Sequence, residues 1–120
     1  MLNLDTHILL FLLSGELRAR ERRVLRDDPE WSISGIVLWE ISRLHTKGRI
    51  SMSLETPELL EQLRRLHIWS IDLAVARCLS QLDFEADPAD QLIAATSLAH
   101  GIRLMTRDRK IRASRVLEFA

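Results

Sequence analysis

Four carboxylates lie where the sequence passes between an expected strand and an expected helix: Asp5, Glu40, Asp90 and Asp108. The carboxyl ends of strands in an open parallel α/β sheet share one edge, where such folds build their sites. Carboxylates gathered there would repel one another unless a cation held them. Oxygen ligands without a matching cysteine or histidine set suit a hard divalent ion, Mg²⁺ or Mn²⁺. The pattern therefore predicts a metal-dependent enzyme that acts on phosphate esters.

Such a cluster suggests its own chemistry. An ion held by Asp5 and Asp90, with or without Asp108, would keep several waters, because Mg²⁺ dehydrates reluctantly. One water, acidified by the ion, would attack a phosphodiester, and Glu40 would bind through water or orient the attacking one. The residues are compatible with one ion or with a pair of ions.

Short apolar runs alternate with helical patterns along the chain and would position these carboxylates. We expect strands at 1–4, 31–34, 67–71 and 102–106, and a last edge strand at 116–119. We expect helices at about 5–13, 16–28, 35–46, 57–66, 73–82 and 88–100. This alternation predicts one α/β domain over residues 1–120, with a parallel sheet and helices on both faces.

Several of the acidic residues have a simpler explanation as helix starts. Asp5 could serve only as the N-cap of the first helix, since Asp is favoured there. Asp87 as N-cap, Pro88 as the first helical residue and Asp90 near the positive end of the dipole would also make a good helix start. Both explanations stay open for Asp5 and Asp90, whereas capping is our interpretation of Asp87.

Glu40 and Asp108 differ in whether a purely structural role can account for them. Glu40 lies inside the most apolar helical stretch, where a charged residue is seldom buried without a partner. Asp108 follows an expected strand, and a surface turn is its alternative, since Asp is common in turns. Four such coincidences at one sheet edge are less probable than any single one, so we favour a cluster.

Composition excludes several other classes. The chain has 120 residues, 47% of them hydrophobic and 28% charged, which suits one globular domain. Its net charge is zero, so the whole molecule does not attract nucleic acid by its field alone. Cys78 has no second cysteine to pair with, which fits the cytoplasm. The apolar N-terminal run holds Asp5 and His7 and predicts neither a signal peptide nor a membrane span.

Four segments together resemble one family: LDTHILLF, VLWEIS, DPADQLIAATSLAHG and RLMTRD. They are similar to the PIN-domain ribonucleases, and more specifically to the VapC-type toxins of toxin–antitoxin (VapBC) pairs, over the range Leu4 to Asp108. The resemblance implies a three-layer α/β/α fold around a parallel sheet of four or five strands. It makes Asp5, Glu40 and Asp90 the core acidic residues and Asp108 the fourth. Thr6 and Thr106 match supporting positions.

The same resemblance implies an activity and partners. The protein would be a Mg²⁺- or Mn²⁺-dependent endoribonuclease, the toxin of a type II toxin–antitoxin system, with RNA as substrate. A VapB-type antitoxin and a homodimeric state are the implied protein contacts, and no membrane is involved. Among the basic residues near Asp108, we expect RNA contacts from Arg107, Arg109 and Lys110, although a solvated charged face is the simpler reading.

Four further expectations concern surfaces and alternatives. The first helix is so apolar that we expect an antitoxin to bind in a groove lined by apolar residues of the first two helices. The basic C-terminal segment of that antitoxin would dock over the four carboxylates. We expect the three tryptophans, Trp31, Trp39 and Trp69, in the core or a subunit interface. His7 is interpreted as a neighbour of the site, since a hard ion does not favour imidazole. A catalytically silent PIN fold or a receiver-like signalling module is the alternative function, against which the intact acidic set argues.

Overall fold

A parallel sheet of four strands lies at the centre of the fold, and the computed structural model describes all residues from 1 to 120. The strands are β1 (Leu2–Leu4), β2 (Trp31–Ser34), β3 (His67–Trp69) and β4 (Arg103–Met105). Their order is β3-β2-β1-β4, and every neighbouring pair is parallel. The carboxyl ends of all four strands therefore meet at one edge, which confirms the predicted type of sheet.

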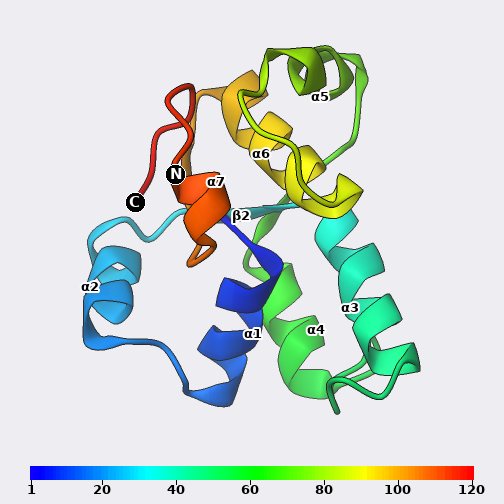
Figure 1. Cartoon of the computed structure of the whole chain (residues 1–120). Coiled ribbons are helices and arrows are strands. Elements are labelled where there is room, and N and C mark those ends of the chain that lie inside the picture. Colours follow the sequence, from blue (N-terminus) through cyan, green and yellow to red (C-terminus); the bar gives the residue numbers. More distant parts are fainter.

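Helices cover both faces of this sheet. The connections from β1 to β2 and from β2 to β3 carry α1 (Thr6–Ser14), α2 (Ala19–Asp27), α3 (Ile36–Thr46) and α4 (Pro57–Arg64). The return from β3 to β4 carries α5 (Leu73–Cys78), the 3₁₀ helix η1 (Leu79–Gln81) and α6 (Pro88–His100), and α7 (Arg109–Arg112) follows β4. Because parallel crossovers are right-handed, the reversal of direction puts α5 and α6 on the face opposite α1–α4 (Figure 1). None of these helices has the length and apolar character that a membrane crossing requires.

The hydrophobic core lies between the sheet and its helices. Leu4, Ile33 and Leu104 come from three neighbouring strands and are fully buried. Leu9 of α1 and Ile93 of α6 close the core on the two faces of the sheet. Burying one side chain of this size contributes about 1.5–3 kcal/mol. This packing fixes the strand ends that the carboxylates follow.

One polar side chain crosses the core and ties α6 to β1. Nδ2 of Asn3 donates to the carbonyl oxygen of Ile93 (3.0 Å) and to Oγ of Ser97 (2.9 Å). Asn3 is fully buried, so these bonds take the place of water. Since α6 carries Asp90 and β1 leads into Asp5, Asn3 helps to set the spacing of the two carboxylates.

The structure corrects the predicted elements in three places. The segment 116–119 forms a single parallel bridge, Leu104 with Phe119, rather than an edge strand. Helix α2 begins at Ala19 rather than at 16, because the Glu21 carboxylate accepts the Arg18 N–H (2.7 Å) and so starts the helix there. Helix α7 was not predicted, because four residues carry no helical periodicity.

Candidate metal centre and active site

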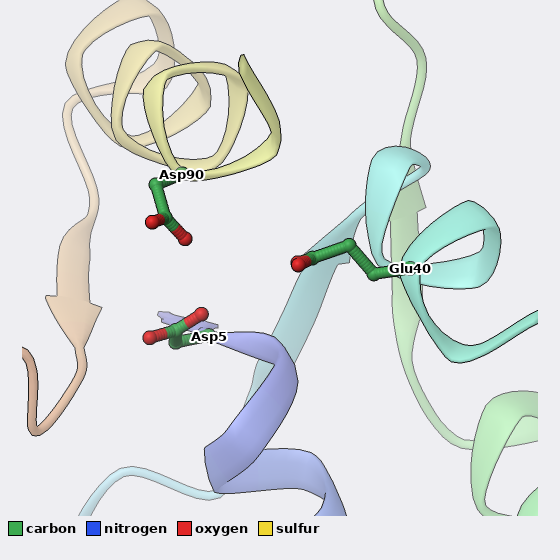
Figure 2. Close-up of side chains that lie close together, drawn as sticks. All are labelled: Asp5, Glu40 and Asp90. Atoms are coloured by element: carbon green, nitrogen blue, oxygen red, sulfur yellow. The ribbon is translucent and has the colours of Figure 1, made fainter. Parts of the chain in front are cut away.

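Three of the four predicted carboxylates come together at the carboxyl edge of the sheet. Asp5, Glu40 and Asp90 each present one oxygen atom, and these atoms all lie within 4.8 Å of one another. Figure 2 shows the three side chains, from the start of α1, from α3 and from α6, directed toward a shared space. We call these three residues the acidic triad. Segments far apart in the sequence build it, which is typical of a site rather than of local capping.

Asp5 occupies the most enclosed position of the triad, with 6% of its surface exposed. It is the N-cap of α1, because its Oδ1 accepts the Thr6 N–H at 2.7 Å. Its Oδ2 accepts the hydroxyl of Thr106, which follows β4, at 2.6 Å. The backbone N–H of Asp5 donates to the carbonyl of Met105 (3.0 Å). Capping and membership of the triad are therefore both true of Asp5.

Glu40 reaches the triad from the second turn of α3. Val37 and Ile41 on the same helix are fully buried, so the register of α3 is set by its apolar face. The Thr6 hydroxyl donates to Oε1 of Glu40. This contact supplies the partner that a half-buried carboxylate requires. Thr6 and Thr106 thus each orient one carboxylate, as the resemblance implies for these positions.

Asp90 lies in the first turn of α6, near the positive end of the helix dipole. Pro88 is the first residue of this helix, and Gly101 ends it in the left-handed conformation at φ 61°. Because α6 leads back to the start of β4, its N-terminus lies at the carboxyl edge of the sheet. The direction of α6 therefore places Asp90 next to the other two carboxylates of the triad.

Burial dominates the protonation of the triad. The pKa of Asp90 is raised to about 6, chiefly by desolvation and to a smaller extent by the charges of Asp5 and Glu40. The pKa of Asp5 and that of Glu40 are also raised, in both cases chiefly by desolvation, while the threonine hydrogen bonds act in the opposite direction. A bound divalent cation would reverse these shifts, because it favours the ionised carboxylates. Three convergent carboxylate oxygens match the donor set of Mg²⁺ or Mn²⁺.

Asp108, the fourth predicted carboxylate, does not join the triad. Its Oδ1 accepts the N–H groups of Lys110 (2.9 Å) and Ile111 (3.1 Å), so it caps α7. It nevertheless lines a hollow of about 420 Å³ beside Asp90, and its charge raises the pKa of Asp90. We call this space the acidic hollow, and its lining residues are Glu85, Ala86, Asp87, Asp90, Asp108 and Lys110.

Asp87 behaves differently from our interpretation of it as a helix cap. It does occupy the N-cap position of α6, but its side chain makes no capping hydrogen bond. It is exposed and borders the acidic hollow. Its charge contributes to the raised pKa of both Glu40 and Asp90. The sequence pattern Asp-Pro therefore identified the helix start correctly but not what the Asp87 side chain does.

A second hollow of about 410 Å³ lies along α3 and also reaches Asp87. Trp39 lines it with 48% of its surface accessible, so a core position is wrong for this residue, and the alternative of a subunit interface stays a prediction. We call this space the α3 hollow. Its polar and aromatic lining consists of Trp39, Glu40, Arg43, Lys47, Arg49 and Asp87. It adjoins the triad at Glu40.

The three residues proposed to contact RNA fall into two groups. The Arg107 guanidinium binds the Glu21 carboxylate through two bonds of 2.8 and 2.7 Å and lies 3.9 Å above the ring of Phe11. Arg109 and Lys110 are exposed, and Lys110 lines the acidic hollow. Arg107 is thus engaged within the protein, and the other two are free to meet a ligand.

The apolar side chains in the second half of helix α1 are only partly covered. Phe11, Leu12 and Leu13 are partly buried and pack against the core, and Arg107 covers the Phe11 ring. His7 is exposed, and its charge lowers the pKa of Asp5 and of Glu40 without belonging to the triad. Phe11, Leu12 and Leu13 keep part of their surface accessible, and the antitoxin groove along the first two helices stays a prediction.

Comparison with known proteins identifies the family of this chain. Residues 3–116 match the profile of the family described as PIN domain. The chain is 31% identical to Ribonuclease VapC22 of Mycobacterium tuberculosis (strain ATCC 25618 / H37Rv) over 119 residues, which covers 93% of this chain and 90% of the relative.

Solved structures agree on the fold. VapBC2 from Rickettsia felis, bound to a DNA fragment from its promoter, aligns with a TM-score of 0.73 at 19% identity, covering 100% of this chain and 98% of that one. DNA-bound VapBC from Salmonella typhimurium aligns with a TM-score of 0.73 at 21% identity, covering 99% and 96%. With the profile match and the curated relative, the triad at the sheet edge leads to one conclusion: the chain belongs to the PIN-domain family, as a member of its VapC-type branch.

Proposed function

We propose that this protein is a VapC-type endoribonuclease that depends on a divalent cation, Mg²⁺ or Mn²⁺, and acts as the toxin of a toxin–antitoxin pair. The observation that carries the proposal is the acidic triad, with its oxygen atoms within 4.8 Å of one another. Membership of the family and 31% identity to a VapC ribonuclease support the same reading.

The residues divide the chemistry among them. Asp5 and Asp90 would hold the ion, and Asp108 remains a proposed outer carboxylate on the acidic hollow. When bound, a divalent ion lowers the pKa of an attacking water and stabilises charge that develops on the phosphate. Glu40 would bind the ion through water or orient the attacking water, since it belongs to the triad. Thr6 and Thr106 orient the carboxylates that they contact.

The substrate needs cations outside the triad. Arg109 and Lys110 are exposed next to Asp108, and phosphate contacts from such residues position a strand without reading its sequence. Arg107 is the weakest of the three candidates, because Glu21 already occupies its guanidinium. Single-stranded RNA is the proposed substrate class.

Inhibition by an antitoxin follows from the same charges. Structures similar to this chain are described as toxin–antitoxin complexes, including one from Klebsiella pneumoniae. A basic antitoxin segment that placed an arginine over the acidic hollow would compete with the ion, because guanidinium binds carboxylates bidentately. A homodimer is part of the same proposal, and the mass of the purified protein in solution tests it.

The test is a cleavage assay on single-stranded RNA with Mg²⁺ or Mn²⁺ and with a chelator. Asp90→Asn should lose cleavage while it keeps its fold, and the matched control Asp27→Asn, at an exposed acid outside both hollows, should cleave like the parent. Unchanged cleavage by Asp90→Asn would mean that the site is misplaced. A parent protein that binds RNA but cleaves it with neither ion would instead be the silent binding module.

A further inference from the structure

A large aromatic side chain stands exposed immediately beside the triad. Trp39 precedes Glu40 in α3, and 48% of its surface is accessible, whereas Val37 and Ile41 of the same helix are buried. Its ring forms part of the α3 hollow, which has a volume of about 410 Å³ and also includes Glu40. An indole left open to solvent has an apolar face that a ligand can cover. Because the hollow adjoins the triad, that ligand would lie next to the reacting groups.

Cations follow Trp39 along the same helix. The Arg43 guanidinium lies 4.7 Å from the centre of the Trp39 ring, one helical turn away. Lys47 lies one further turn along, and Arg49 also lines the hollow. The rise of an α-helix places Lys47 about 10 Å beyond Glu40. The hollow also has two acidic residues. Glu40 belongs to the triad, and the charge of Asp87 raises the pKa of Asp90.

We propose that the α3 hollow is the subsite for the nucleotide next to the scissile phosphodiester, with its base stacked on Trp39. Arg43, Lys47 and Arg49 would then bind the following backbone phosphates. This inference rests on the proposed ribonuclease function and adds the residues that hold the strand. A cationic groove with an aromatic platform is the arrangement that binds single-stranded nucleic acid. Stacking on Trp39 tolerates any base, so the subsite fixes the register of the strand more than its sequence.

The distribution of charged side chains along the α3 hollow favours RNA over a protein segment as its ligand. A strand entering the site must bring one phosphate to the triad and keep its neighbours away from the other carboxylates. The α3 hollow meets that need, because Glu40 and Asp87 lie at the triad and Arg43 and Lys47 lie along the helix away from it. A basic inhibitory peptide would be attracted to the acidic hollow and repelled by these cations.

The experiment measures affinity for a mixed-sequence single-stranded RNA in the Asp90→Asn background, together with kcat and KM in the otherwise unchanged protein. Trp39→Ala should weaken RNA binding by roughly five- to a hundredfold, because stacking one base on an aromatic ring has that effect. Trp39→Phe should keep most of the affinity. Arg43→Ala and Lys47→Ala should each reduce the slope of log affinity against log salt by about 0.7. The matched control is Arg64→Ala, an exposed arginine outside both hollows.

Three results would overturn the inference. The first is Trp39→Ala that binds and cleaves RNA like the parent. The second is an equal loss of RNA affinity in Trp39→Phe and Trp39→Ala, with the melting temperature of the parent in both variants. An aromatic ring at position 39 would then not be what binds the base. The third is Trp39→Ala with normal RNA kinetics and lost binding to a protein partner. If the parent itself neither binds nor cleaves RNA, the proposed function fails and this subsite fails with it. Cleavage by the parent combined with unaffected Trp39 variants would reject the subsite alone.

Discussion

The carboxylates of the triad are held in a high-energy state in the metal-free protein. Burial is the largest cause of the raised pKa of Asp5, of Glu40 and of Asp90, and repulsion by neighbouring carboxylates is a smaller one. The hydroxyl of Thr106 offsets part of this cost at Asp5, because it donates to the ionised form. A divalent cation bound by the triad would recover the remaining cost.

This reasoning predicts how stability depends on pH without metal. The pKa of Asp90 is about 6 in the folded protein against an ordinary 3.8, so the folded state binds its proton more tightly. Between these pH values the folded state carries the extra proton, and the contribution of Asp90 to the free energy of unfolding falls as pH rises. The Asp90→Asn variant has no titrating group at this position, so its free energy of unfolding does not fall for this reason. Its melting temperature in chelator, relative to the parent, should therefore rise across that window and then level off. A difference that is constant with pH would show that Asp90 titrates normally.

Asp87 makes a separate prediction at the same scale. A side chain that caps a helix typically contributes about 1 kcal/mol, but the Asp87 side chain forms no capping bond. Asp87→Ala should therefore leave the metal-free protein as stable as the parent, or slightly more stable, because one negative charge near Asp90 is removed. Chemical denaturation with Asp72→Ala as the comparison tests this, since Asp72 does accept a capping bond from the Val75 N–H (3.1 Å). A loss at Asp87 equal to that at Asp72 would restore the capping interpretation.

Among the elements, α6 and α3 decide where the triad lies. Helix α6 is pinned to β1 by the buried amide of Asn3, and α3 is set by its buried residues Val37 and Ile41. Each helix then delivers one carboxylate to the edge where β1 ends at Asp5. The geometry of the site is therefore a property of packing between layers, and not of the loops around it.

The sequence predicts the parts of this arrangement that have local signals. Alternation of strands and helices gives the sheet and the edge, and the motifs around Asp5, Glu40 and Asp90 give the triad. The role of Asp108 was less predictable, because α7 has only four residues and its cap looks like any acidic turn. The exposure of Trp39 could not be predicted, since α3 is apolar on several sides and only its packing shows which side is buried.

The connection between α2 and the segment after β4 carries a prediction about Arg107. Its guanidinium binds the buried Glu21 carboxylate, which also accepts the Arg18 N–H, so removing it leaves a charge without its partner. Arg107→Ala should reduce the free energy of unfolding by about 2 kcal/mol, the usual contribution of hydrogen bonds to charged groups. RNA affinity per folded molecule should fall less than in Lys110→Ala. Urea denaturation and RNA titration measure the two effects, with Arg64→Ala, an exposed arginine outside both hollows, as the control. Normal stability combined with lost RNA binding would return Arg107 to the substrate.

For the molecule as a whole, net charge is zero while the surface around the site is strongly divided. Carboxylates gather at the triad and the acidic hollow, and cations line the α3 hollow. RNA binding would therefore depend on local complementarity instead of a general field. This division of charge is what the proposed binding of both a cation and a polyanion would require.

A metal ion bound by the triad should stabilise the entire fold, because it joins the start of α1, α3 and α6. A ligand that binds only the folded state at a hundred times its Kd adds about 2.7 kcal/mol. For a domain of this size, that corresponds to a rise in melting temperature of about 10 °C. Thermal melting with increasing Mn²⁺ or Mg²⁺ should show this rise in the parent and not in Asp5→Asn, which removes the most buried ligand. Asp27→Asn should behave like the parent, and potassium chloride at equal ionic strength should have little effect. An equal rise in Asp5→Asn and the parent would place the ion elsewhere on the surface and leave the triad without its cation.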